Sequence, residues 1–182
     1  YSIGQKWNLK TGFVKNVGFG ERNPQKSTKP YEIDFVPGVA FVVRKKVIED
    51  VGLLDEEYFL YFEEPDYCLR AKRVGYKTFL VPDTVAYHKF AASTSKVGLL
   101  VFYYFQRSRL RFIIKNIESV YLPLALIINI GHILVVSYLI SIKKKTPLLM
   151  VQGIKAIFEN LLSFRRARST FHAQTECTDA NN

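Results

Sequence analysis

The densest group of reactive side chains is a run of six carboxylates within the twelve residues from 55 to 66. The run is unusual because the chain has 26 Lys and Arg residues against 16 acids, a net charge of +10. Carboxylates set between aromatic residues, just before a proline that can begin a helix, suit proton transfer or cation binding. The six are Asp55, Glu56, Glu57, Glu63, Glu64 and Asp66.

A helix is predicted over residues 65–74, with a proline at its first position and Gly75 after its last turn. The free N–H groups and the dipole at a helix N-terminus hold nearby carboxylates ionised. Glu63, Glu64 or Asp66 could therefore serve as a general base. The alternative is that these acids only cap the helix, which on spacing alone is the commoner role.

The elements around this helix are short. Scattered glycines and prolines over 1–31 predict edge strands joined by turns, and 33–44 predicts a buried strand bent at a Pro-Gly pair. Residues 45–51 predict a short helix ended by a glycine, and 77–81 and 84–87 predict strands around a Pro-Asp turn.

A longer ordered pattern runs through these elements. It consists of Gly38, Phe41 to Arg44, Leu54-Asp55-Glu56, Phe59 to Asp66, Cys68-Leu69-Arg70, Gly75-Tyr76, Val81-Pro82 and Tyr87-His88. This order resembles the second half of family 2 glycosyltransferases, especially the rhamnosyltransferase-like members, over about residues 3–116. The resemblance implies an α/β fold, the C-terminal portion of a GT-A-type mixed sheet with flanking helices.

The resemblance also implies a reaction: inverting transfer of a sugar from a nucleotide-sugar donor to a hydroxyl of a glycan or lipid-linked acceptor, as in cell-surface polysaccharide synthesis. Family members carry a Glu-Asp pair before this helix, and its second acid takes the acceptor proton. Glu64 occupies that position here, one methylene longer than Asp, and Glu63 is the second candidate. A misplacement near one ångström can lower a rate about a hundredfold.

Three further site residues follow from the resemblance. Gly38 matches a glycine beside the acceptor, Asp66 belongs to the substrate site or caps the helix, and His88 matches a histidine near the donor diphosphate or its Mn²⁺ or Mg²⁺. A strand bend explains Gly38 equally well, and a surface or packing role explains His88. Since the sequence has no Asp-x-Asp motif, the donor-binding half is expected to be missing and the metal to come only with it. The chain alone is then expected to be inactive.

The segment 103–110 resembles the Tyr-Tyr, Arg-Asn-Arg-Leu stretch of the rhamnosyltransferase-like group, with Ser108 at the usual Asn position. Arg107 and Arg109 are predicted to contact a diphosphate or an anionic lipid carrier through paired N–H donors. The alternative is a solvated basic helix face next to a membrane.

The last third of the chain points to lipid. Residues 120–142 form an uncharged run of 23, long enough to cross a hydrocarbon core of about 30 Å as a helix. Basic residues flank both ends, so the positive-inside rule gives no orientation, and a re-entrant helix would keep them all cytoplasmic. Helical spacing of apolar residues over 148–162 predicts an amphipathic helix on anionic lipid or against the catalytic domain.

The predicted organisation has four parts: a partial catalytic domain (1–116), a membrane-spanning or re-entrant helix (117–145), an amphipathic basic helix (146–169) and a disordered tail (170–182). The sequence is consistent with two functions. One is the acceptor side of a membrane-associated glycosyltransferase with its catalytic portion on the cytoplasmic side. The other is a non-catalytic, basic membrane-surface binding module. Nucleic acid is not an expected partner.

Overall fold

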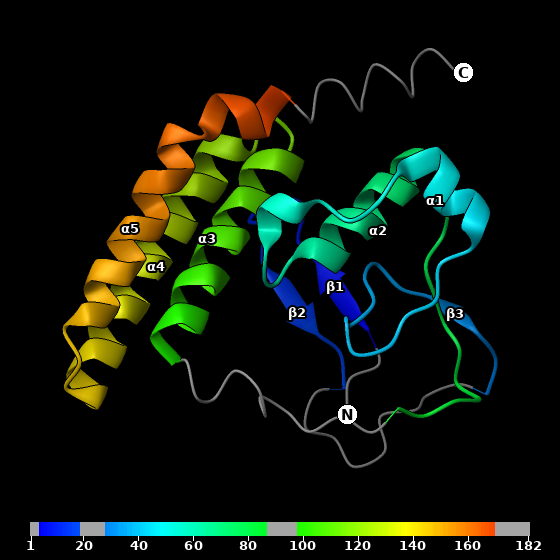
Figure 1. Ribbon diagram of the computed structural model, residues 1–182, viewed down its shortest axis with the longest axis horizontal. Coiled ribbons are helices and arrows are strands. Elements are labelled where there is room, and N and C mark those ends of the chain that lie inside the picture. The colour runs from blue at the N-terminus through cyan, green and yellow to red at the C-terminus, as the bar shows by residue number, and fades with distance from the viewer. Residues whose placement is uncertain (1–3, 19–27, 87–97, 170–182) are drawn as a thin grey trace.

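The computed structural model describes residues 4–18, 28–86 and 98–169. Three long helices lie side by side on one side of the molecule, and the short strands and two smaller helices lie on the other (Figure 1). The helices are α1 (Lys45–Val51), the 3-10 helix η1 (Glu56–Tyr58), α2 (Glu63–Arg73), α3 (Gly98–Asn116), α4 (Leu122–Lys144) and α5 (Leu148–Leu162).

The described strands form two separate antiparallel pairs. β1 (Gln5–Trp7) pairs with β2 (Val14–Asn16), and β3 (Tyr31–Glu32) pairs with β4 (Phe79–Leu80). The expected edge strands within 1–31 are thus present. The mixed sheet of a GT-A fold stays a prediction, because the described strands do not extend beyond these pairs.

The predicted strand over 33–44 is wrong. Of its residues, Phe35 alone forms a bridge, exchanging backbone hydrogen bonds of 3.0 and 3.3 Å with Gln5. Pro37 has no N–H to donate to a ladder, and the chain turns immediately after it. The predicted strand at 77–81 shortens to the two residues of β4, and 84–86 form no strand.

The helix predictions are closer to the structure. α1 has the predicted bounds, and Gly52 ends it in the left-handed region with φ of 81°. α2 begins at Glu63, two residues earlier than predicted, because Phe62 adopts a left-handed backbone and accepts a 3.1 Å hydrogen bond from the Asp66 N–H. Glu63 and Glu64 therefore belong to its first turn.

α3 joins the two sides of the molecule. Its Phe112 packs with Phe35 and Tyr58 in the core beneath α2. Its Leu110 and Ile114 pack against Ile133 of α4 in the bundle. One helix thus contributes to both cores, so the position of α2 is fixed relative to the bundle.

Candidate active site

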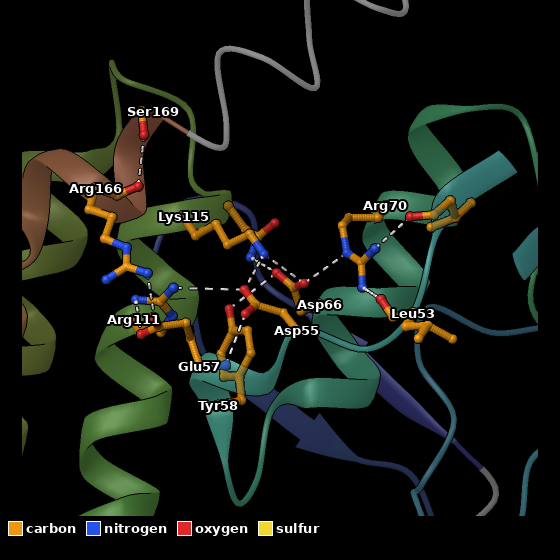
Figure 2. Close-up of polar contacts among 12 residues, drawn as sticks. Leu53, Asp55, Glu57, Tyr58, Asp66, Arg70, Arg111, Lys115, Arg166 and Ser169 are labelled. Carbon is orange, nitrogen blue, oxygen red and sulfur yellow. Dashed lines mark hydrogen bonds and ion pairs between the residues drawn. The ribbon is translucent and has the colours of Figure 1, made fainter. Parts of the chain in front are cut away.

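Three of the six clustered acids, Asp55, Glu57 and Asp66, pair with basic side chains of α3 or of the segment after α5 (Figure 2). The Lys115 Nζ lies 2.8 Å from Asp55 Oδ2, and the Arg111 guanidinium lies 3.8 Å from Asp55 and 3.7 Å from Glu57. Arg166 adds a 2.9 Å contact to Glu57. Burial alone would raise the pKa of Asp55, but the hydrogen bond and charge of Lys115 lower it below the usual value. Asp55 is thus held ionised as a structural partner of Lys115, and Glu57 pairs with Arg111 and Arg166.

A third acid, Asp66, is fully buried and surrounded by donors. Its Oδ1 accepts hydrogen bonds from the Tyr58 hydroxyl at 3.1 Å and the Asn116 amide at 3.0 Å. Its Oδ2 accepts from Arg70 Nε at 3.0 Å and Lys115 Nζ at 2.9 Å. With both oxygens engaged by the protein, Asp66 acts here to join α2 to α3, and its substrate contact stays a prediction.

Glu64 lies elsewhere, against Gly38. A Cβ built on Gly38 would overlap the Glu64 carboxylate. The Gly38 backbone is not in the left-handed region, so the glycine supplies space for the carboxylate rather than conformational freedom. The fold thus brings together two residues that the sequence assigned to one site from positions 26 apart.

The surroundings of Glu64 change its acidity. Burial, and then the neighbouring Glu63 carboxylate, raise the pKa of Glu64 from 4.5 to about 7. The Glu63 Oε2 is buried without a hydrogen-bond partner among the described residues. A half-buried carboxyl that titrates near neutrality beside an unpartnered acceptor is suited to take a proton from a bound hydroxyl.

Gly38→Ala is expected to displace the Glu64 carboxylate toward solvent, because the new methyl group needs the same volume. The titration midpoint of Glu64, followed by NMR with ¹³C-labelled glutamate, should then fall toward 4.5. Gly131→Ala is the matched control, since a Cβ there meets nothing within 4 Å. An unchanged midpoint in Gly38→Ala would show that Gly38 does not determine where Glu64 lies.

The two arginines of the predicted anion site lie in different surroundings. Arg109 is 5% exposed, bonds to Asn129 and to His132 Nδ1 at 2.9 Å, and lies over the Phe13 ring at 4.6 Å. Arg107 is more accessible and donates a 2.8 Å hydrogen bond to the Glu57 carbonyl. Contact of either with a diphosphate or lipid carrier stays a prediction.

The alternative of a solvated basic face over 103–110 is wrong for Arg109, which is buried. Further along α3, Arg111 and Lys115 are buried too. Both pair with Asp55 before α2, and Lys115 also pairs with Asp66 in the first turn of α2. Local spacing does not indicate this pairing, because Lys115 lies 49 positions after Asp66.

An open hollow lies beside this pairing, between η1, α3 and α5. It is lined by Asp55, Glu56, Glu57, Phe59, Tyr103, Tyr104, Arg107 and Glu159. Phe59 is 71% exposed and packs at a tilt against Tyr104, with ring centroids 4.6 Å apart. This aromatic pair was not singled out from the sequence, although the two aromatic runs that supply it were visible there.

The described residues do not supply a metal site. Over 4–18, 28–86 and 98–169, no group of three or more His, Cys, Asp or Glu side chains gathers to hold an ion. His88, the predicted metal residue, lies outside the described residues. The predicted Mn²⁺ or Mg²⁺ therefore stays tied to a donor-binding half.

α4 is the one helix within the described ranges that is long and apolar enough to cross a membrane. Its residues Asn129, Ser137 and Ser141 are buried against the protein. Asn129 is fully buried and donates 2.7 Å hydrogen bonds to the Thr11 and Ala125 carbonyls. Its large apolar residues face outward, among them Ile127, Val135 and Leu139.

The contact between α4 and α5 is built from small and polar residues. Ser137, Ser141, Gly153 and Ala156 are buried, and a Cβ on Gly153 would overlap the Ser137 hydroxyl. The outer face of α5 is apolar instead: Leu148, Val151, Ile154, Phe158, Leu161 and Leu162 are exposed. Small residues inside and large apolar residues outside are typical of helices that pack within lipid.

Comparison with known proteins gives partial matches. No family model matches the chain, and no solved structure does. Over 59 residues it is 30% identical to the low-salt glycan biosynthesis hexosyltransferase Agl10 of Haloferax volcanii, covering 32% of this chain and 19% of that protein. Over 85 residues it is 26% identical to the dTDP-rhamnosyl transferase RfbF of Shigella flexneri. This match covers 46% of this chain and 29% of that protein. Part of the chain is similar to glycosyltransferases. The matched segments span less than a third of the length of either relative.

Proposed function

We propose that the chain is the acceptor-side part of a family 2 inverting glycosyltransferase with a GT-A fold, acting in cell-surface polysaccharide synthesis. The observation that carries the proposal is the placement of Glu64, half-buried against Gly38 with its pKa raised to about 7. The partial similarity to a hexosyltransferase and a rhamnosyl transferase supports the same class of reaction.

In the proposed reaction, ionised Glu64 accepts the proton of an acceptor hydroxyl as the hydroxyl oxygen bonds to the anomeric carbon of the donor sugar. The bond between that carbon and the diphosphate breaks, and the nucleoside diphosphate leaves with the electron pair. The result is inversion at the anomeric carbon. A base whose pKa lies near the working pH accepts a proton efficiently while remaining largely ionised.

The donor-binding half would supply the nucleotide-sugar site and a divalent metal that offsets charge on the departing diphosphate. The test joins a donor-binding domain from a family 2 enzyme upstream of Tyr1 and offers dTDP-rhamnose or a UDP-hexose with a glycan or lipid-linked acceptor. Sugar transfer by the joined protein, and none by the chain alone, is the expected result. Nucleotide binding without transfer to any acceptor would count against the proposal.

We also propose that α4 and α5 place the catalytic part at a membrane, on its cytoplasmic side. α4 has 23 residues, about 35 Å of helix against a hydrocarbon core of about 30 Å. The exposed lysines 143–145 lie at the C-terminal end of α4, just before α5, where they can meet anionic headgroups.

Val135→Lys is expected to weaken binding to vesicles of phosphatidylglycerol and phosphatidylcholine. Val135 is 56% exposed on the outer face of α4, and a lysine near the centre of a membrane helix costs about 2.5–3.5 kcal/mol. That cost corresponds to roughly a hundredfold loss in partition, measured by flotation. Val42→Lys is the control, because Val42 is 98% exposed but lies in the loop before α1. Equal loss in both variants would contradict a lipid-facing α4.

A non-catalytic membrane-surface module remains the second candidate, favoured by the apolar outer faces of α4 and α5. The two candidates share membrane binding but differ at Glu64. A capping acid has no need of the space that Gly38 leaves for its carboxylate. Vesicle binding combined with no transfer after a working donor half is joined would favour the second candidate.

A further inference from the structure

The loop between η1 and α2 has an uncommon backbone. Phe59, Tyr61 and Phe62 have φ of 51°, 67° and 69°, in the left-handed region that bulky L-residues rarely adopt. Such a conformation persists only where the surrounding structure determines it, and it is concentrated at functional sites. Phe62 is the N-cap residue directly before α2, so the loop determines where the first turn with Glu63 and Glu64 lies.

α3 provides the contacts that hold this loop. The fully buried Ser108 hydroxyl lies 2.9 Å from the carbonyl oxygens of both Tyr58 and Leu60. Arg107, the residue before Ser108, donates a 2.8 Å hydrogen bond to the Glu57 carbonyl. Three backbone carbonyls, those of Glu57, Tyr58 and Leu60, therefore lie within hydrogen-bonding distance of two adjacent residues of α3.

Aromatic side chains complete the attachment. Phe59 packs against Tyr104 with centroids 4.6 Å apart, and Tyr61 packs against Phe105 at 5.5 Å. Phe62 lies 5.6 Å from Phe105. These contacts are not directional enough to choose a left-handed backbone by themselves, whereas hydrogen bonds to specific carbonyls are.

We propose that Ser108 and Arg107 are positioning residues, which hold the loop 57–62 in its left-handed conformation and thereby keep the Glu64 carboxylate against Gly38. In this role they act through the loop backbone, to which both side chains are bonded. The consequence for sugar transfer rests on the proposed role of Glu64, but the placement of Glu64 can be measured without any transfer.

Ser108→Ala removes the hydroxyl that faces the two carbonyls and leaves the helix otherwise intact. The loop should then relax, expose Glu64 to water and lower its NMR titration midpoint from about 7 by about one pH unit. Ser108→Thr keeps the hydroxyl and should restore the midpoint. Ser137→Ala is the control, because it removes another fully buried hydroxyl, one that bonds within α4 at 2.6 Å.

The readout separates positioning from general stability. If Ser108→Ala only lowers the melting temperature, as Ser137→Ala should, and Glu64 keeps its midpoint, the proposal is overturned. If Ser108→Ala does not fold, Arg107→Gln provides the measurement, since Arg107 is partly exposed and its loss removes only the bond to the Glu57 carbonyl and the ion pair to Glu159. An unchanged midpoint there overturns the proposal, and a lowered one supports it, whether or not Glu64 proves to be the catalytic base.

Discussion

Glu64→Gln should abolish sugar transfer by the chain joined to a donor-binding half, while nucleotide-sugar binding stays largely intact. Glutamine has nearly the same shape, so it can occupy the space beside Gly38, but it cannot accept the acceptor proton. Loss of a positioned base lowers turnover by about 10²–10⁴-fold. The measurement is kcat for transfer together with calorimetric binding of the donor. Retained turnover would reject Glu64 as the base.

The pH dependence of sugar transfer by the unsubstituted protein should also be determined by the ionisation of Glu64. Because the base must be ionised and the pKa of Glu64 is about 7, the rate should rise with pH up to about 7 and level off above it. The stability effect has the opposite direction. The folded state binds the Glu64 proton more tightly than the unfolded chain, so stability falls as pH rises from 4.5 through 7.

Glu64→Gln should therefore melt at a higher temperature than the parent protein above pH 7, although it is inactive. Glu63→Gln is the comparison variant for activity only, because it also removes a charge that raises the pKa of Glu64. It changes the adjacent residue of the same helical turn, and we expect it to retain measurable transfer. A Glu64→Gln variant that loses both activity and stability would indicate that the Glu64 carboxylate stabilises the fold, and not that it is a catalytic base whose ionised form destabilises the fold.

The parts of the fold that the sequence predicted are those that local chemistry determines. α1 could be delimited because a glycine ends it, and α2 because a proline and a glycine stand near its two ends. The segment 33–44 misled because its composition is that of a strand. The segment does not form a strand because the chain turns after Pro37. Gly38 is needed there because the Glu64 carboxylate, 26 positions later in the sequence, occupies the space of its Cβ.

The candidate site could be predicted only in part, because contacts between residues far apart in the sequence divide it. Spacing alone placed all six acids in one group, and a resemblance was needed to choose Glu64. The division of the group depends on side chains of α3, whose Arg111 and Lys115 lie buried against Asp55 and Asp66. No periodicity distinguishes such buried charges from a solvated basic face, because both place Lys and Arg one helical turn apart.

Asp66→Ala is expected to lower the free energy of unfolding by about 3–5 kcal/mol, the usual cost of removing one partner of a buried ion pair. Lys115 and Arg70 would each lose a close anionic partner in a site where the Asp66 side chain is fully buried. The measurement is thermal or urea unfolding in a lipid nanodisc. Asp50→Ala should change little, because Asp50 pairs with Lys46 at the surface, where water screens the pair.

A second substitution tells a buried ion pair from simple packing. Adding Lys115→Met to Asp66→Ala removes one of the two cations that had paired with Asp66 and fills volume with an apolar side chain. Asp55 keeps Arg111 at 3.8 Å and the Glu57 N–H at 3.0 Å, so part of the lost stability should return. If Asp66 mattered only through the space it fills, the second substitution would add to the damage. Recovery would show that charge balance between α2 and α3 holds the first turn of α2, and with it Glu64, at a fixed position relative to the bundle.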